Sequence, residues 1–230
     1  MVSHRDGRIF TSLVILDKSG SMSSIRTEAI NGYNETLASI KSTQDEFAQT
    51  QEHFVSLAAF CGHGVEMIHD MIPIDKAEKL TGEQYRPCCM TPLFDAIGIS
   101  VTKMRKRIAD EADSLVIVTV ITDGHENASK EWDSKTVHRL IEDCKEEGWT
   151  FSFIGAGEEV IKVASTISIT NTMLWEATSE GTERMFATEI KARKKHCRLF
   201  EGIKCRMDAD AAQTKIIKKI LSESYYKEED

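Results

Sequence analysis

The sequence predicts an α/β fold in which helices cover both faces of a doubly wound, mostly parallel β-sheet. Apolar runs of strand length alternate with amphipathic helical segments along most of the chain, as in proteins built from parallel strands and crossover helices. One link breaks this alternation: Gly62-His63-Gly64 is too short for a crossover helix and indicates an antiparallel hairpin. We therefore expect a six-stranded sheet whose one antiparallel strand lies at an edge.

The six expected strands are apolar runs rich in branched and aromatic residues. The run over 9–16 is almost continuously apolar, which is typical of a strand buried on both faces of a parallel sheet. The expected strands cover residues 9–16, 53–61, 65–74, 114–122, 149–154 and 169–175.

The expected helices show apolar residues at intervals of three or four. The first helix contains Gly32 as a local weakness, and the second opens at Thr91-Pro92, where proline is tolerated in the first turn. A third helix is expected directly after the 114–122 strand, and a fourth over residues 158–166. This order of elements predicts a Rossmann-like arrangement. The apolar positions of the first three helices are Ile25, Ala29, Tyr33, Leu37 and Ile40; Leu93, Ile97, Val101, Met104 and Ile108; and Val137, Leu140, Ile141 and Cys144.

The length of 230 residues suits one domain with an appendage. We expect a core domain over residues 1–177. Residues 178–230 would add a closing helix and a C-terminal helical extension, with helical spacing over 208–222, packed on the same domain. We expect the tail from Tyr225 to Asp230 to be frayed.

Charge and apolar content restrict the class of protein. The net charge of −8 argues against a surface that is wholly a nucleic-acid footprint. The start of the chain lacks the pattern of a secretory signal, and the apolar runs are far shorter than the roughly 20 residues that span a bilayer. We expect a soluble, intracellular protein of the cytoplasm.

The cysteines and histidines show no zinc-type or CxxC spacing. The six cysteines are therefore expected to be reduced thiols, and the adjacent Cys88 and Cys89 to be packing residues, with a redox role as the alternative. His53, His63 and His69 flank the expected hairpin and are interpreted as surface or core histidines.

Hard oxygen ligands follow two strands and precede one helix. Asp17, Ser19 and Ser21 follow the first strand, Thr91 stands at a helix N-terminus, and Asp123 follows the 114–122 strand. Because such loops converge at the carboxyl edge of a parallel sheet, we expect the five side chains to lie together. Two carboxylates and three hydroxyls favour Mg²⁺ or Mn²⁺ over zinc.

These residues resemble the metal-ion-dependent adhesion site of the von Willebrand factor type A (vWA) family, in its bacterial-type intracellular form. That site has the pattern Asp-x-Ser-x-Ser, a distant Thr and a distant Asp. Here Asp17-Lys18-Ser19-Gly20-Ser21, Thr91 and Asp123 match it. The resemblance extends over roughly residues 9 to 177 and includes the hairpin between the first and second helices.

The resemblance implies a metal-dependent protein-interaction module and no enzyme. Ser19, Ser21 and, in the ligand-bound state, Thr91 would coordinate Mg²⁺ directly, with Mn²⁺ or Ca²⁺ as alternatives. Asp17 and Asp123 would coordinate directly or through water. An Asp or Glu of a partner protein would complete the shell; no membrane partner is implied.

Two other functions stay open at this stage. The segment Lys191–Arg198 holds five Lys or Arg in eight residues, which indicates a solvated face or a nucleic-acid or ribonucleoprotein surface. A Mg²⁺-dependent phosphoryl-transfer enzyme is less favoured because Ser19 stands where that pattern has a second Asp, and no phosphate-binding glycine loop is present. His125, Glu126 and Asn127 are interpreted as solvated loop residues, with partner or metal contact as the alternative.

Overall fold

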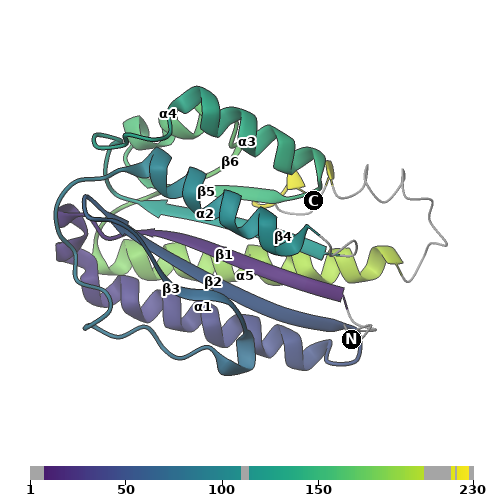
Figure 1. Ribbon diagram of the computed structural model, residues 1–230. Helices are drawn as coiled ribbons and strands as arrows, with labels where there is room; N and C mark the ends of the chain where they lie inside the picture. Colours follow the sequence, from purple (N-terminus) through teal and green to yellow (C-terminus); the bar gives the residue numbers. More distant parts are fainter. Residues whose placement is uncertain (1–7, 110–113, 205–218, 221, 228–230) are drawn as a thin grey trace.

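A computed structural model describes residues 8–109, 114–204, 219–220 and 222–227 (Figure 1). Its centre is a six-stranded sheet in the order β3-β2-β1-β4-β5-β6. All neighbouring strands are parallel except β2 and β3, and β3 is an edge strand. The predicted fold class is therefore confirmed. The strands are β1 (Arg8–Asp17), β2 (Gln51–Cys61), β3 (Gly64–Pro73), β4 (Ser114–Thr122), β5 (Thr150–Ala156) and β6 (Asn171–Trp175).

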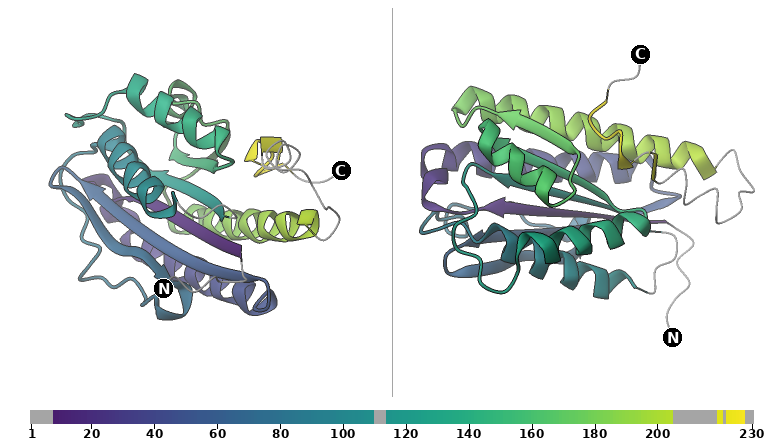
Figure 2. Two further views of the ribbon diagram at one scale, coloured as in Figure 1. Left: turned by 45° about the vertical axis from the view of Figure 1, so that its right-hand side comes forward. Right: turned by 90° about the horizontal axis from the view of Figure 1, so that it is seen from above.

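Helices cover both faces of the sheet (Figures 1 and 2). One apolar core joins the sheet to α2 (Leu93–Ile108), α3 (Ser134–Glu146) and α4 (Glu158–Thr166). The second core lies on the opposite face, where α1 (Arg26–Glu46) packs beside α5 (Ser179–Lys204). The fold therefore has three layers, with the sheet between two layers of helices. The loops that follow β1 and β4 meet the start of α2 at the carboxyl edge of the parallel strands.

Gly32 is the point where α1 and α5 pack most closely. A Cβ at this position would lie 1.9 Å from Cδ2 of Phe186, whose side chain is fully buried. The residue that the sequence indicates as a weakness of α1 thus admits an aromatic ring against the helix backbone. The intrinsic cost of glycine in a helix is offset by this packing.

The basic segment of α5 is partly a buried network. Arg193 is buried and donates hydrogen bonds to Ser12 Oγ and Thr119 Oγ1, both at 2.8 Å, and to Glu189 Oε1 at 2.7 Å. Arg198 is exposed and forms an ion pair with Glu46 at 2.9 Å. The interpretation of this segment as a solvated face is therefore wrong for Arg193, which helical spacing alone could not separate from its exposed neighbours.

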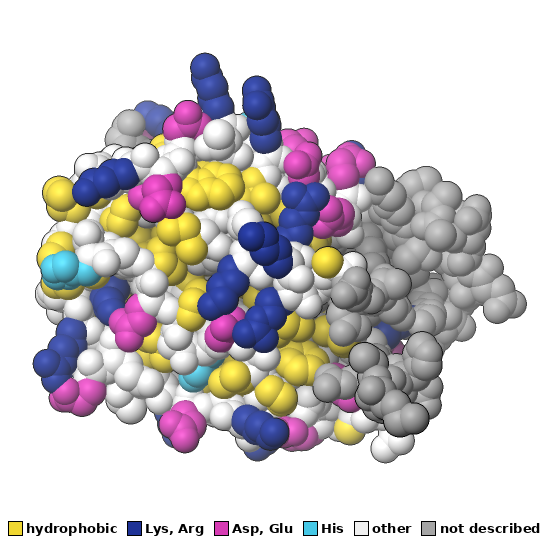
Figure 3. Space-filling model, viewed as in Figure 1, with side chains coloured by type: hydrophobic (Ala, Val, Ile, Leu, Met, Phe, Trp, Pro, Cys, Tyr) yellow, Lys and Arg dark blue, Asp and Glu magenta, His cyan; other side chains and the backbone are white. Residues whose placement is uncertain are grey.

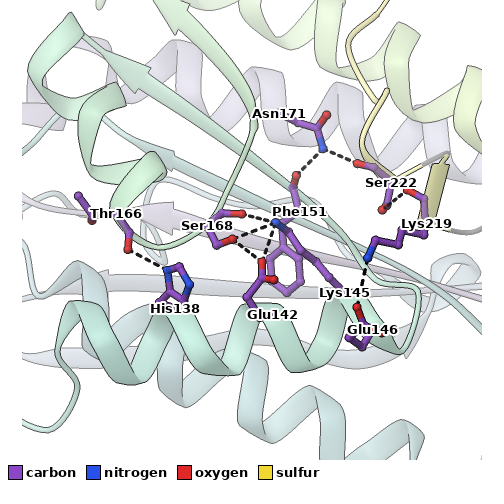
Figure 4. Close-up of polar contacts among 10 residues, drawn as sticks. All are labelled: His138, Glu142, Lys145, Glu146, Phe151, Thr166, Ser168, Asn171, Lys219 and Ser222. Carbon is purple, nitrogen blue, oxygen red and sulfur yellow. Dashed lines mark hydrogen bonds and ion pairs between the residues drawn. The ribbon is translucent and has the colours of Figure 1, made fainter.

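The last described residues pack against the domain. Asn171 Nδ2 donates to the carbonyl of Ser222 at 2.5 Å, and Lys219 forms an ion pair with Glu146 at 3.2 Å (Figure 4). Tyr225 is buried and donates to Glu189 Oε1 at 2.9 Å. The expected fraying is thus wrong for Tyr225, while residues 228–230 and most of the helix expected over 208–222 lie outside the described residues. The division at residue 177 stays a prediction.

Charged side chains on the face formed by α2 are mixed in sign (Figure 3). Lys103 and Arg107 both form ion pairs with Asp70 at 2.9 Å, and Arg105 pairs with Glu147. The positive charge at the end of α2 is therefore matched by acidic neighbours. Within the described ranges, no helix is both long enough and apolar enough to cross a membrane.

Candidate metal site at the carboxyl edge of the sheet

The ends of β1 and β4 bring the first two acidic loops together. These strands are parallel neighbours, with Leu16 opposite Ile121 in the last paired position. Asp17 and Thr122 end their strands, and Thr122 Oγ1 donates to Asp17 Oδ2 at 2.5 Å. Register alone therefore places the loop after Asp17 beside the loop that begins with Asp123.

A chain of hydrogen bonds connects four of the five predicted site residues. The backbone N–H of Ser19 donates to Asp17 Oδ1 at 2.6 Å. The hydroxyl oxygens of Ser19 and Ser21 are 3.2 Å apart, and Ser21 Oγ donates to Asp123 Oδ1 at 2.7 Å. The polar atoms of Asp17, Ser19, Ser21 and Asp123 thus form one continuous cluster.

Thr91, the fifth predicted residue, faces the same cluster across Gly124. A Cβ at Gly124 would lie 2.9 Å from Thr91 Oγ1 and 3.6 Å from Asp17 Oδ2, so both oxygens border the same glycine. Thr91 is buried, and within the described part of the chain its hydroxyl makes no hydrogen bond. Only a residue without a side chain at position 124 leaves this hydroxyl where it is.

The loop that holds Thr91 is fixed by residues after β4. Thr91 N–H donates to Asn127 Oδ1 at 2.9 Å, and Asn127 N–H donates to the Thr91 carbonyl at 3.2 Å. Glu126 accepts from the N–H groups of Phe94 and Ser129, both at 2.8 Å. Asn127 and Glu126 therefore position the start of α2, whereas the neighbouring His125 is exposed.

The two carboxylates carry negative charge that the hydrogen bonds around them compensate only in part. Burial raises the pKa of Asp17 to about 6; hydrogen bonds from Thr122 and Ser19 lower it in part, and repulsion from Asp123 raises it. Burial also raises the pKa of Asp123. Over the ranges that the structure describes, neither carboxylate has an ion-pair partner. A cation beside both groups would remove this unfavourable charge.

Several residues that shape the site escaped the sequence analysis. Thr122 orients the Asp17 carboxylate, and Gly124 leaves room for the Thr91 hydroxyl. Tyr85 is fully buried and donates from its hydroxyl to the Asp17 carbonyl at 2.5 Å. The adjacency of Thr122 and Gly124 to Asp123 is the one local signal; nothing in the sequence near Tyr85 indicates its contact with Asp17.

Of the three histidines beside the hairpin, His53 and His69 are buried in the interior. His53 is buried, and its ring stacks on Phe10 with centroids 4.8 Å apart. His69 is buried and its Nδ1 is 2.8 Å from the Tyr33 hydroxyl. These contacts agree with the interpretation of both as core histidines.

No family model and no curated protein matches this sequence. Solved structures do match its fold. The pilus adhesin SpaC from Lactobacillus rhamnosus GG shares 12% identity over 83% of this chain and 31% of its own, with a TM-score of 0.59. Proximal thread matrix protein 1 from the mussel byssus shares 13% over 83% of this chain and 47% of its own, with a TM-score of 0.52. Manganese-loaded TRAP protein of Plasmodium vivax shares 14% over 75% of this chain and 70% of its own, with a TM-score of 0.50.

The matches and the topology define a class of α/β domain. Its sheet is parallel apart from one edge strand, and that strand is formed by a hairpin between the first and second helices. The chain has the fold of the von Willebrand factor type A domain. It spans less than half of the length of the SpaC and mussel byssus chains.

Proposed function

We propose that this chain is a metal-dependent protein-interaction module that captures an acidic side chain of a partner protein. One observation carries the proposal. Five oxygen-bearing side chains from three separate loops converge at the carboxyl edge of the sheet, and the two carboxylates among them have no ion-pair partner within the described residues. Such convergence is expected of a ligand site in this type of sheet.

The donor set fits a hard divalent cation. Asp17, Ser19, Ser21, Thr91 and Asp123 offer only oxygen atoms, which favours Mg²⁺, with Mn²⁺ or Ca²⁺ as alternatives. The manganese-loaded TRAP structure supports a divalent ion in a domain of this fold. The negative charge of the buried Asp17 would balance part of the positive charge of the ion. The exposed Ser21 and the half-buried Asp123 form the side of the site that is open to solvent.

Three neutral hydroxyls among the five donors explain why an acidic partner is expected. An ion held mainly by neutral donors stays electrophilic and accepts an external carboxylate. The chain itself then supplies a surface around that contact. Met90, directly before Thr91, is 57% exposed, and gives the rim of the site an apolar side chain for a protein partner.

Nucleic-acid binding through Lys191–Arg198 is the less favoured function. Arg193 of this segment is buried against Glu189, and Arg198 is paired with Glu46. Both ion pairs neutralise positive charge that would otherwise attract the phosphate backbone of a nucleic acid. The proposed setting is the cytoplasm, where thiols stay reduced, in keeping with the free cysteines of the described residues.

The proposal is tested first by metal binding and then by capture of a partner. Calorimetric titration with Mg²⁺ should show binding that Asp17→Ala abolishes. Thr91→Ala should reduce capture of protein from the native cell, as should EDTA, because this hydroxyl is one of the five proposed ligands of the ion. Thr188→Ala, an exposed threonine on α5, is the matched control and should capture normally.

Two results would contradict the proposal. A partner retained equally in EDTA and by Asp17→Ala would remove the metal from the function. Capture that survives these changes but disappears after nuclease treatment, or after charge reversal at Lys194 and Lys195, would establish the nucleic-acid alternative instead.

A further inference from the structure

A cluster of thiols and one imidazole lies next to the five oxygen-bearing side chains of the proposed Mg²⁺ site, which we call the oxygen site. Cys61 is the last residue of β2, His63 stands in the β2–β3 turn, and Cys88 lies in the segment before α2. One ligand atom from each of these three residues lies within 4.8 Å of the other two. A fourth candidate ligand atom, Cys89 Sγ, lies 3.5 Å from His63 Nδ1.

The distances match the edges of a tetrahedron around a metal ion. Zinc with Zn–S of about 2.3 Å and Zn–N of about 2.0–2.1 Å separates tetrahedral ligands by about 3.8 Å between sulfurs and about 3.6 Å between sulfur and nitrogen. Here Cys61 Sγ and Cys88 Sγ are 3.4 Å apart, and His63 Nδ1 lies 3.8 Å from the first and 3.5 Å from the second. The three separations lie within about 0.4 Å of the tetrahedral values, so a small movement of the Cys61 and Cys88 side chains would complete the spacing.

The backbone around the cluster shows a close approach of two segments and one residue in a left-handed conformation. A Cβ at Gly62 would lie 3.1 Å from Cys89 Cβ, so the hairpin turn approaches the Cys88-Cys89 segment closely. Cys88 N–H donates to the Lys18 carbonyl at 2.8 Å, which fixes the segment against the loop after β1. Cys89 has a φ of 63°, a left-handed conformation that is unfavourable for a non-glycine residue. The fold maintains this conformation at the cluster.

We propose that Cys61, His63 and Cys88 form a second metal site, with Cys89 beside it, for a thiophilic divalent ion of the Zn²⁺ class. Thiolate and imidazole donors select zinc over Mg²⁺, so the site differs in chemistry from the oxygen cluster of Asp17. A disulfide would engage two sulfurs and leave the imidazole without a role. The inference rests on the cluster alone and does not depend on the proposed capture of an acidic partner.

The sequence does not indicate this cluster, because its cysteines and histidines show no zinc-type spacing. The sequence pairs Cys61 with His63 and Cys88 with Cys89, and His63 and Cys88 are 25 positions apart. Neither pair has CxxC spacing, so the pattern alone gave no signal. The β2–β3 turn brings the first pair onto the second.

A bound ion would join the hairpin to the loop that leads to Thr91. Cys88 precedes Thr91 by three residues, and the carbonyl of Cys89 accepts from Gly20 N–H at 3.1 Å. The thiol site would therefore hold together two loops that border the oxygen site. It acts as a brace for these loops whatever the oxygen site binds.

The test uses the full chain, purified in a non-thiol reductant and loaded with Co²⁺ as a probe for Zn²⁺. We expect roughly one equivalent of Co²⁺ with near-ultraviolet thiolate charge-transfer bands and intense visible bands of a tetrahedral ion, displaced by Zn²⁺ but not by excess Mg²⁺. Cys88→Ser and His63→Ala should reduce Co²⁺ affinity at least ten-fold. His63 is exposed and Cys88 half-buried, so both variants should fold, as far-ultraviolet circular dichroism will verify.

Two variants serve as controls. Cys144→Ala removes a buried thiol of α3 and Asp17→Ala disables the oxygen site; both should retain the charge-transfer bands. The proposal is overturned if the wild-type chain shows no such bands, if they persist in Cys88→Ser, or if they vanish in Asp17→Ala. A Cys61–Cys88 disulfide that persists in the reductant would overturn it as well.

Discussion

Thr122 Oγ1 donates a hydrogen bond to Asp17 Oδ2 at 2.5 Å across the ends of two neighbouring parallel strands. The same hydroxyl accepts from Gly124 N–H at 3.1 Å. One threonine side chain thus orients the buried carboxylate and starts the turn that carries Asp123. Thr122 is a positioning residue for the oxygen site.

Thr122→Val should weaken Mg²⁺ binding by about ten- to a hundred-fold, the usual range for loss of an outer hydrogen bond to a ligand. The substitution keeps the shape of the side chain but removes an interaction that lowers the pKa of Asp17. Calorimetric Mg²⁺ titration measures the effect. The control is Thr11→Val in β1, because Thr11 Oγ1 is buried without a hydrogen-bond partner among the described residues, and its loss should leave Mg²⁺ affinity unchanged. Equal affinities of both variants would refute the assigned role.

Gly124→Ala should displace the Thr91 hydroxyl and reduce both Mg²⁺ affinity and partner capture. The added Cβ would stand 2.9 Å from Thr91 Oγ1, closer than a Cβ contact allows, and the backbone of Thr91 is held by Asn127. Gly20→Ala is the matched control in the same site, since its Cβ would meet the backbone oxygen and nitrogen of Cys89 at ordinary contact distances of 3.5 and 3.8 Å. Normal Mg²⁺ affinity in Gly124→Ala would show that Thr91 is not a ligand.

The pH dependence of the metal-free protein should show two opposed contributions. The folded state holds the Asp17 proton more tightly than the unfolded chain, with a pKa of about 6 against 3.8. This carboxylate therefore lowers the free energy of unfolding above about pH 6, and the penalty disappears as pH falls towards 3.8. Burial, with a further contribution from Arg193, lowers the pKa of His53 and of His196 from 6.5 to about 4. Their contribution is complete above pH 6.5 and is lost as pH falls towards 4.

Asp17→Asn isolates the carboxylate from the histidines. In EDTA at about pH 8 the variant should be more stable than the wild type by up to about 3 kcal/mol, from roughly two pKa units at 1.36 kcal/mol each. Denaturant unfolding should show the difference shrinking as pH falls below 6. Saturating Mg²⁺ should reverse the order, because only the wild type gains binding energy. A variant less stable than the wild type at every pH in EDTA would contradict the uncompensated charge at Asp17.

Sequence periodicity predicted what depends on local pattern. The bounds of β4 and α4 agree with the expected ranges 114–122 and 158–166, because their apolar residues face the cores without exception. The start of β2 was missed because Gln51 is polar, and only the structure shows it buried with its Oε1 2.8 Å from His53 Nε2.

The sequence allows the five oxygen-bearing residues to be grouped together, but it does not indicate the residues that surround them. Convergence of the loops follows from parallel topology, so the grouping of Asp17 with Asp123 needed no side-chain detail. The parts played by Thr122, Gly124 and Tyr85 depend on contacts across the chain, which residue type does not encode. The same holds for the thiol cluster, which a hairpin turn assembles from two uninformative pairs.

Gly32→Ala should destabilise the protein although alanine favours helices. The Cβ would overlap the Phe186 ring, and overpacking typically costs about 1–3 kcal/mol, partly offset by about 1 kcal/mol of helix propensity. Denaturant unfolding gives the free energy. In the double variant with Phe186→Leu, the loss from Gly32→Ala should be smaller than in the wild-type background, giving a coupling between the two positions. Additive losses would show that the ring does not limit position 32.

Tyr225→Ala should test whether the C-terminal segment belongs to the folded domain. The tyrosine is buried in the same apolar cluster as Phe10 and Leu115, and its hydroxyl is one of the donors to the buried Glu189. Truncation of such an aromatic side chain costs about 3–5 kcal/mol, whereas Tyr225→Phe should cost only about 1 kcal/mol for the lost hydrogen bond. The matched control is Glu223→Ala, an exposed residue of the same segment that should leave stability unchanged. Denaturant unfolding of the full-length variants decides the matter: if Tyr225→Ala unfolds like Glu223→Ala, the segment adds nothing to the domain and the boundary belongs before it.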